Sequence, residues 1–289
     1  MRVFITGATG YIGAAVCRAL KARGHEVVGL TRGEAGARRL EALGARAARG
    51  DVKLPDSYRK EAQAADALIH AAFEYGSAAI EADRLALDTL IAAGKPLIYT
   101  SGVWVLGPRS EAAADEDSPV SPLDVVAWRP AHEDEALRAG AVVLRPGCVY
   151  GGRGGLYGQM IQDAVDGKPV TLCGEGENRW ASVDLDDLAA LYALLIEKKA
   201  RRAIYHATDG RAEPLRRGAQ ALARAAGGGE VRAVPLVELS KKLGPFAAAL
   251  AVDQLVSSEK ARRDLGWKAN GAGVAARAVE LVKAWKAGA

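Results

Sequence analysis

Long apolar runs, cysteines and an excess of either charge are all scarce in this chain of 289 residues. The most apolar window, residues 245–252, is far shorter than the ~18–20 residues of a membrane-spanning helix, so we expect no membrane association. The net charge of +4 is a small difference between 39 basic and 35 acidic side chains and argues against a nucleic-acid partner. Three scattered cysteines predict neither disulfides nor a zinc site, and four histidines lack metal-ligand spacing, so we expect no metal.

The first residues, MRVFITGATG, pass from a strand-like segment directly into glycines. They lack the basic start, the apolar stretch and the cleavage site of a secretory signal peptide. Together with the low cysteine content, this favours a reducing cytoplasm as the location. With 49% hydrophobic and 26% charged residues, the chain can bury a sizeable core.

What the sequence does contain is a regular alternation of short β-branched runs and alanine-rich or leucine-rich segments. Strands are expected at 3–6, 27–30, 67–71, 97–100 and 142–145, and helices near 11–23, 34–43, 55–63, 78–93 and 130–139. This pattern predicts an α/β fold with a doubly wound parallel sheet.

The chain is also expected to have two parts. A dinucleotide-binding domain is predicted over 1–150, with 179–206 returning to it, and a smaller substrate lobe over 151–289. The acidic, proline-containing stretch from Pro108 to Val126 interrupts the alternation and predicts a long loop.

A glycine loop joins the first predicted strand to the first predicted helix. Glycines at such a turn let backbone N–H groups approach a pyrophosphate, while the helix N-terminus contributes positive partial charge. This position between strand and helix predicts a Rossmann-type dinucleotide site. Its expected cofactor contacts are Gly7, Thr9, Gly10, Tyr11, Ile12 and Gly13.

The end of the second predicted strand bears on the choice of cofactor. A carboxylate here usually binds the ribose hydroxyls of NAD, whereas this chain has Thr31 and Arg32. Arg32 could pair with the 2′-phosphate of NADP. Glu34 could be the missing acid, although it follows the end of the strand. We therefore expect NADP rather than NAD, with NAD still possible.

Motifs in a fixed order along nearly the whole chain resemble the extended short-chain dehydrogenase/reductases, the group that contains the NAD-dependent epimerase/dehydratase proteins. The motifs are TGATGYIG at 6–13, GDV at 50–52, LIHAA at 68–72, YTSG at 99–102, LRPGCVYG at 144–151, RWASVDLDDLA at 179–189 and SEKARRDLGW at 258–267. The resemblance implies further cofactor contacts from Asp51, Val52, Ala71, Ala72, Phe73, Thr100, Ser101, Pro146, Gly147 and Val149. It also implies a possible homodimer through helices 78–93 and 130–139.

The resemblance fails at the catalytic helix, VVAWRPAHEDEAL at 125–137. Such enzymes use Tyr-x-x-x-Lys there, and Trp128 and His132 occupy those two positions. The family's serine position falls on Gly102, next to Ser101. An indole N–H cannot act as an acid near neutral pH. His132 could bind the nicotinamide ribose in place of lysine, which we favour, or serve as a general acid, or only pack.

Other side chains could complete such a site. Further potential proton donors are Tyr75, Tyr150, Tyr157 and Ser101. Tyr75 and Tyr157 could also contact the substrate, and Arg153 and Arg179 could meet an anionic substrate or form surface ion pairs. The sequence thus predicts an NADP-dependent oxidoreductase acting on a small carbonyl or a sugar-nucleotide-like metabolite. A dinucleotide sensor without catalysis and an epimerase or dehydratase are the alternatives.

Overall fold

The computed structural model describes residues 1–74, 76 and 78–288, so Tyr75, for which a substrate contact is predicted, lies outside the described residues. The described chain forms two compact units. The first unit comprises 1–101, 128–145 and 189–205, and the second comprises 102–127, 146–188 and 206–289.

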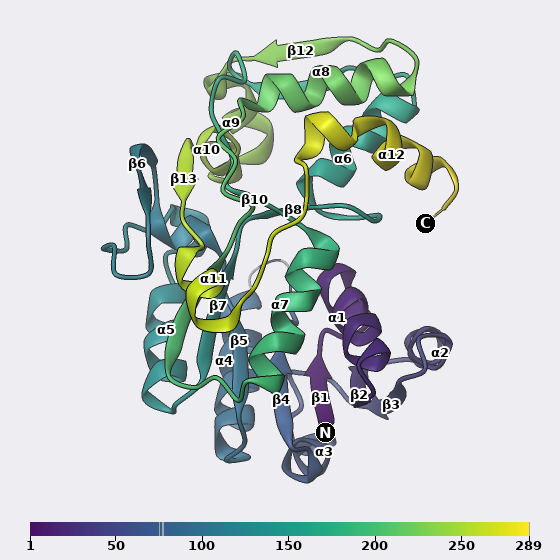
Figure 1. Cartoon of the computed structure of the whole chain (residues 1–289), viewed down its shortest axis with the longest axis vertical. Helices are drawn as coiled ribbons and strands as arrows, with labels where there is room; N and C mark the ends of the chain where they lie inside the picture. The colour runs from purple at the N-terminus through teal and green to yellow at the C-terminus, as the bar shows by residue number, and fades with distance from the viewer. Residues whose placement is uncertain (75, 77, 289) are drawn as a thin grey trace. The chain divides into compact units, whose positions relative to one another are not determined.

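The first unit is built on a seven-stranded sheet with the order β11-β7-β5-β4-β1-β2-β3 (Figure 1). Its strands are β1 (Arg2–Thr6), β2 (Glu26–Thr31), β3 (Arg46–Arg49), β4 (Ala67–His70), β5 (Leu97–Thr100), β7 (Val142–Pro146) and β11 (Ala203–Ala207). The pairings from β3 through β7 are all parallel. The predicted α/β fold with a doubly wound parallel sheet is therefore confirmed.

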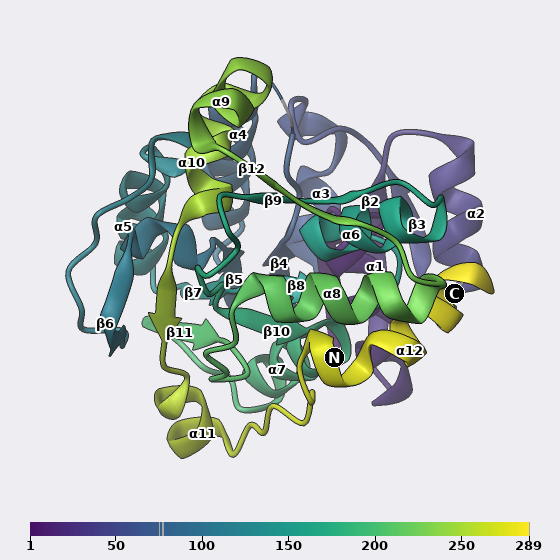
Figure 2. The same ribbon diagram turned by 90° about the horizontal axis from the view of Figure 1, so that it is seen from above.

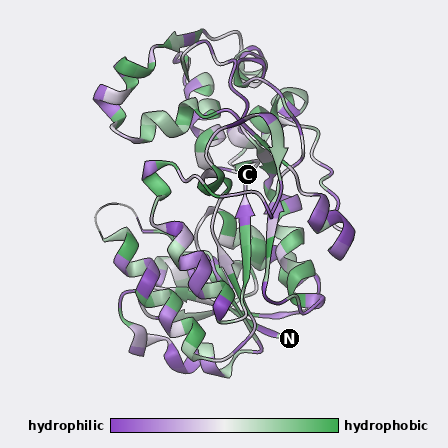
Figure 3. Cartoon of the chain, turned by 90° about the vertical axis from the view of Figure 1, so that its left-hand side faces the viewer, coloured by the Kyte–Doolittle hydropathy of each residue, from purple (hydrophilic) through white to green (hydrophobic). Residues whose placement is uncertain are grey.

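The helices of this unit follow the strands, as expected for βαβ connections. They are α1 (Tyr11–Ala22), α2 (Glu34–Ala42), the 3-10 turn η1 (Pro55–Ser57), α3 (Arg59–Ala64), α4 (Ala79–Ala92), α5 (Arg129–Arg138) and α7 (Leu185–Glu197), whose first residues belong to the second unit. Figure 3 shows hydrophobic residues concentrated along the strands and mixed surfaces on the helices. The strands are buried between helices, which explains their almost continuous apolar sequences.

The second unit consists of short helices and two-stranded sheets. Its helical elements are η2 (Val103–Leu106), η3 (Asp124–Val126), α6 (Gly155–Val165), α8 (Leu215–Ala226), α9 (Leu236–Leu243), α10 (Phe246–Ala251), α11 (Glu259–Leu265) and α12 (Val274–Lys286). Its strands are β6 (Arg109–Ala114), β8 (Cys148–Tyr150), β9 (Val170–Cys173), β10 (Ser182–Asp184), β12 (Val231–Val234) and β13 (Gln254–Val256). Helices α8 and α12 pack side by side (Figures 1 and 2) over a core that includes Trp180 and Tyr157.

The stretch from Pro108 to Val126 differs from the predicted loop. Its first part forms β6, which pairs with β13, and Gln254 of β13 donates side-chain hydrogen bonds to the carbonyl oxygens of Val103 and Gly107. Within the acidic part, the carboxylate of Glu116 is buried and accepts the backbone N–H of His206. These long-range pairings place 102–127 in the second unit, whereas the prediction had assigned it to the domain over 1–150.

Candidate active site

Because the strands of the first unit are parallel, their carboxyl ends meet at one edge of the sheet. The glycine loop follows β1 at this edge. Gly7 has φ +73°, and a Cβ on it would lie 2.5 Å from the backbone of Ala71 and Ala72 after β4. A Cβ on Gly13 would lie 2.1 Å from the Gly7 carbonyl oxygen. Both glycines are therefore required for the loop to lie against β4 and the start of α1.

The same loop leaves the N-terminus of α1 open to a ligand. Gly10 is its N-cap and makes no side-chain capping bond, so the first backbone N–H groups of the helix have no side-chain acceptor from that residue. Around it, Thr9, Tyr11 and Ile12 are half-buried. A backbone cradle made of glycines at a helix N-terminus fits the pyrophosphate of a dinucleotide.

Arg32 lies at the end of β2, with its side chain 66% exposed. Its Nη1 is 3.1 Å from Oε1 of Glu74, in the segment that follows β4. Thr31 is buried, and the helix α2 approaches it so closely that a Cβ on Gly36 would overlap its hydroxyl. In the structure the Arg32 guanidinium is thus paired with a carboxylate, and its contact with a 2′-phosphate stays a prediction.

The other predicted contacts of this unit lie at neighbouring strand ends. After β3, Asp51 accepts the backbone N–H of Lys53, and the carbonyl oxygen of Val52 accepts the Tyr58 hydroxyl. After β4, Ala71 and Ala72 are half-buried, while Phe73 is 49% exposed. These positions form one continuous edge with the glycine loop.

Two residues follow the end of β5. Thr100 shares a hydrogen bond of 2.6 Å with the Tyr192 hydroxyl of α7. The backbone of Ser101 bonds to Leu144, but its buried hydroxyl has no hydrogen-bond partner among the described residues. The Ser101 hydroxyl is therefore a buried polar group that a bound ligand could hydrogen-bond.

Helix α5 carries the residues at the family's tyrosine and lysine positions. Trp128 is its N-cap and His132 lies one turn later, with the two rings in an edge-on contact at a centroid distance of 4.9 Å. The buried guanidinium of Arg129 lies 4.6 Å from the Trp128 ring and donates a hydrogen bond to the carbonyl oxygen of Thr100. Glu133 forms a buried ion pair with Arg145 of β7, with Nε and Oε1 3.0 Å apart, and so anchors the helix to the sheet.

The structure adds a buried carboxylate that the sequence analysis missed. Nδ1 of His132 is 2.7 Å from Oδ2 of Asp83 on α4, and the Tyr99 hydroxyl donates to the same oxygen at 2.7 Å. Nε2 of His70 is 3.3 Å from Oδ1 of Asp83, and Nδ1 of His70 is hydrogen-bonded to Thr6. Three strands (β1, β4 and β5) and two helices (α4 and α5) are thus joined by one polar network.

Charge in this network is concentrated on Asp83. Burial alone would raise the pKa of its carboxyl, but the hydrogen bond from His132 and the adjacent His70 outweigh burial and hold the pKa well below its usual range. The carboxylate is therefore ionised and must accept the Nδ1–H of His132. This arrangement fixes the ring and leaves Nε2, which has no partner among the described residues, as the nitrogen able to exchange a proton.

The signal for Asp83 was present in the sequence of α4. The buried positions of this helix include Ala82, Ala86, Leu87 and Leu90, and Asp83 lies on the same apolar stripe. An ionisable group on the buried face of a helix is rarely tolerated without a partner. That pattern could have identified the residue, although not its partner.

The remaining predicted residues belong to the second unit. Gly147 packs closely, since a Cβ on it would lie 2.4 Å from the Ala181 carbonyl oxygen, and Val149 is buried in β8, two residues after it. Pro146 is buried at the end of β7. Burial raises the pKa of the Cys148 thiol to about 12, as for a structural cysteine.

Arg179 and Arg153 both have protein partners. Arg179 is paired with Asp253, with Nε and Oδ1 2.8 Å apart, and it donates to the carbonyl oxygen of Ser110. Arg153 lies over the ring of Trp285 at 5.1 Å. Of the two alternatives for Arg179, the structure therefore contains the ion pair. Binding of an anionic substrate by Arg179 or Arg153 stays a prediction.

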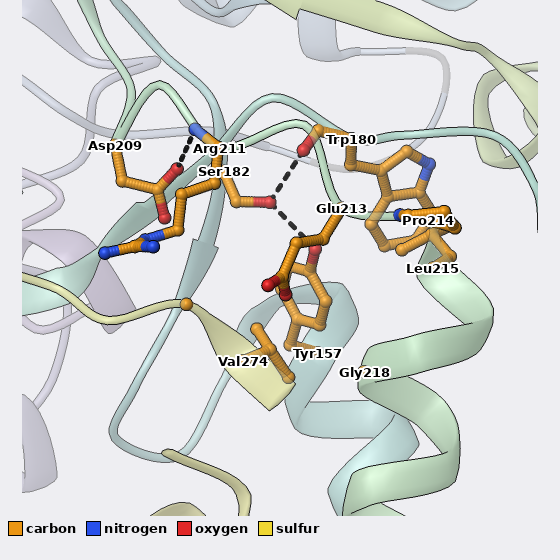
Figure 4. A pocket seen from close by; sticks show the side chains of 11 residues that line it. Tyr157, Trp180, Ser182, Asp209, Arg211, Glu213, Pro214, Leu215, Gly218 and Val274 are labelled. Carbon is orange, nitrogen blue, oxygen red and sulfur yellow. Dashed lines mark hydrogen bonds between the residues drawn. The ribbon is translucent and has the colours of Figure 1, made fainter. Parts of the chain in front are cut away.

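Tyr157 lines a small cavity of about 20 Å³, shown in Figure 4. Its buried hydroxyl shares a hydrogen bond of 2.8 Å with Ser182, and burial raises its pKa far above the usual value. A role as proton donor would require that bond to be exchanged. In the same cavity, burial raises the pKa of Asp209 to about 6, although the backbone N–H of Arg211 and the Tyr150 hydroxyl bond to its carboxyl.

Among the described residues, no three His, Cys, Asp or Glu side chains are grouped as a metal site would require. None of the helices in the described part of the chain is both long enough and apolar enough to span a bilayer.

A parallel sheet with a glycine cradle after its first strand defines a dinucleotide-binding protein. A model of the NAD dependent epimerase/dehydratase family matches residues 3–207, and the chain belongs to this family. The uncharacterized protein YLL056C of Saccharomyces cerevisiae is 30% identical over 93% of this chain and 94% of its own length. The 2'-dehydrokanamycin reductase of Streptomyces kanamyceticus is 31% identical over 71% of this chain and 61% of its own length. The UDP-glucose 4-epimerase of Thermus thermophilus in complex with NAD has a similar fold, with a TM-score of 0.83 at 23% identity over all of both chains.

Proposed function

We propose that this protein is an NADP-dependent carbonyl reductase in which His132, held by Asp83, replaces the family's catalytic tyrosine and lysine. The observation that carries the proposal is the 2.7 Å contact between Nδ1 of His132 and the ionised Asp83 carboxylate. The carboxylate occupies Nδ1 and holds the ring in one orientation, so Nε2 is the ring nitrogen that could donate a proton to a substrate.

The residues of the first unit suit a bound nicotinamide dinucleotide. The backbone of Gly7–Gly13 would hold the pyrophosphate, Arg32 would meet a 2′-phosphate, and Ser101 offers a hydroxyl that has no partner among the described residues. When bound, such a cofactor supplies the hydride for reduction of a carbonyl. The work left to the protein is to orient the substrate and to provide a proton.

His132 would provide that proton from Nε2. In the imidazolium form, Nε2–H donates to the substrate oxygen as this oxygen gains negative charge, and the ring becomes neutral. Asp83 accepts Nδ1–H throughout and therefore keeps the ring in the required orientation. Trp128 packs edge-on against the ring, and its indole N–H cannot exchange a proton near neutral pH.

The choice between NADP and NAD can be tested through Arg32. Calorimetric titration should give tighter binding of NADPH than of NADH, and Arg32→Ala should remove about 1.5–3 kcal/mol of that preference. Glu74→Gln is a matched control, because it frees Arg32 from its carboxylate partner and should strengthen NADPH binding. Tighter binding of NADH by the unmodified protein would contradict the assignment to NADP.

A non-catalytic sensor is the competing function, since both proposals require the same glycine cradle. The test is NADPH oxidation across a panel of aldehydes and ketones by the parent protein and by the double variant Trp128→Tyr with His132→Lys. The reductase proposal expects turnover by the parent. No turnover by the parent, together with activity gained by the double variant, would favour a sensor that has lost its catalyst. The cytoplasmic location and the homodimer stay predictions.

A further inference from the structure

The largest cavity described in the second unit is lined by none of the residues predicted to bind the cofactor or to act in catalysis. It has a volume of about 430 Å³ and is bounded by α6, α9, α10 and the strands β9 and β12. Volumes of roughly 300–1,000 Å³ are typical of sites for small organic molecules. The cavity is therefore large enough to enclose a substrate body.

Apolar side chains make up most of its lining. Met160 of α6, Leu172 of β9 and Trp180 are buried, and Leu239, Phe246 and Leu250 line the side formed by α9 and α10. The indole N–H of Trp180 already donates to the carbonyl oxygen of Leu250, so the polar atom of this ring has a protein partner. Figure 2 shows the helices α6, α9 and α10. Such a lining favours a ligand with a large apolar surface.

Helix α9 extends this apolar surface to the solvent. Leu243, which lines the cavity, is 42% exposed, and on the same helix Leu236 and Val237 are 42% and 68% exposed. Leu243 therefore continues the apolar lining to the surface, whereas Leu236 and Val237 lie outside the lining.

The charged groups around the cavity do not suit a sugar nucleotide. Of the two cations in the lining, Arg232 is paired with Glu230, which leaves Lys242 for an anion. Asp163, also in the lining, would repel a diphosphate. Arg179, the residue for which a diphosphate contact was predicted, is held by Asp253 and is absent from the described lining.

We propose that this cavity binds the apolar body of the substrate, and that the substrate is a long-chain ketone rather than a sugar nucleotide. The assignment of the ligand as a substrate rests on the proposed reductase function. The binding site itself does not, because every residue that forms it belongs to the second unit.

The test measures binding to the full chain without cofactor, by tryptophan fluorescence. The ligands are 2-dodecanone, its short analogue 2-butanone, and UDP-glucose. Each additional buried methylene strengthens binding about fourfold, so 2-dodecanone should bind at least about 100-fold more tightly than 2-butanone. UDP-glucose should bind more weakly than 2-dodecanone.

Two variants of α9 locate the ligand. Leu243→Gln should weaken 2-dodecanone binding about fivefold, because it places a polar group in the cavity wall. Val237→Gln is the matched control, since Val237 is exposed on the same helix but does not line the cavity, and it should leave binding unchanged. Both positions are partly exposed, so neither change should prevent folding.

The outcomes separate this inference from the reductase proposal. Tighter binding of UDP-glucose, or equal effects of the two variants, would overturn the assignment of the cavity. Binding of 2-dodecanone that is weakened by Leu243→Gln supports the cavity even if the protein never oxidises NADPH, a result that would instead refute the reductase. Reduction of short polar carbonyls without binding of 2-dodecanone would support the reductase and refute the assignment of the cavity.

Discussion

Asp83 in the first unit and Asp209 in the second are both carboxylates with less than a tenth of their surface exposed. Their pKa values shift in opposite directions. The pKa of Asp83 falls because His132 and His70 offset its burial, whereas burial raises the pKa of Asp209 to about 6. The hydrogen bonds that Asp209 receives come from a backbone N–H and from Tyr150, neither of which carries charge.

This comparison shows that the partners, rather than burial, decide whether an enclosed carboxylate is charged. The ionised Asp83 can stabilise an imidazolium and support proton transfer. Asp209 has no imidazole partner among the described residues and serves instead to tie β8 to the segment after β11. Two aspartates with similar burial thus fit a catalytic role in one unit and a structural role in the other.

The largest expected difference between Asp83 and Asp209 is in their contribution to the free energy of unfolding. Asp83→Ala leaves His132, His70 and Tyr99 without their common buried partner, so the free energy of unfolding should fall by about 3–5 kcal/mol. Asp209→Ala removes a group bound by neutral donors and should cost about 1–2 kcal/mol. Urea denaturation measures both. Asp88→Ala, at an exposed position on α4, should change stability by less than about 0.5 kcal/mol. Equal losses for Asp83 and Asp209 would remove the distinction between them.

The pH dependence of stability should differ in sign. The raised pKa of Asp209 means that its protonated form is favoured in the folded state. That contribution is present below its unfolded pKa of about 4 and is lost as the pH rises through about 6. Asn cannot ionise. Between about pH 4 and pH 7, the free energy of unfolding of Asp209→Asn should therefore rise by about 2–3 kcal/mol relative to that of the parent.

Asp83 provides the opposite case. Because the pKa of Asp83 is lowered in the folded state, its ionised carboxylate stabilises the fold at pH values above its unfolded pKa of about 4. This stabilisation is lost as the pH falls below that value. Asp83→Asn should therefore be most destabilised relative to the parent at neutral pH and approach it in acid. Parallel curves for the two Asn variants would mean that both carboxylates have the same charge in the folded state.

The smallest expected effect separates the two imidazoles that face Asp83. His70→Asn should reduce the free energy of unfolding by about 1–2 kcal/mol, because Thr6 loses its hydrogen-bond partner. Turnover should change by less than about twofold, since the contact between His132 and Asp83 remains. Steady-state kinetics on the purified variant measures the change in turnover. A loss of turnover comparable to that of a His132 variant would assign the catalytic role to the pair rather than to His132.

The sequence predicted the parts of the protein that depend on local patterns. The glycine loop, five of the seven sheet strands and most helices of the first unit lie within one or two residues of their predicted bounds, because periodicity and glycine spacing act over short distances. The contact between Asp83 and His132 joins residues 49 positions apart and forms only when α4 and α5 both pack on the sheet. The position of His132 could thus be predicted, but its partner could not.

The pairing of β6 with β13 illustrates the same limit in the second unit. The sequence of 108–126 is polar and contains prolines, which locally favours a loop. A distant segment, β13, supplies the strand partner that orders its first part. Likewise, the ion pair of Arg179 with Asp253 depends on a residue 74 positions away.

The central claim, that His132 transfers the proton, is tested most directly by the pH dependence of kcat at saturating NADPH for the parent and for His132→Gln. A general acid must be protonated, so kcat of the parent should fall as the pH rises. His132→Gln should lower kcat by about 10²–10⁴-fold and abolish that dependence, while NADPH binding changes little. The account would be contradicted by a variant that keeps the rate and pH profile of the parent, or by one whose loss lies entirely in NADPH affinity.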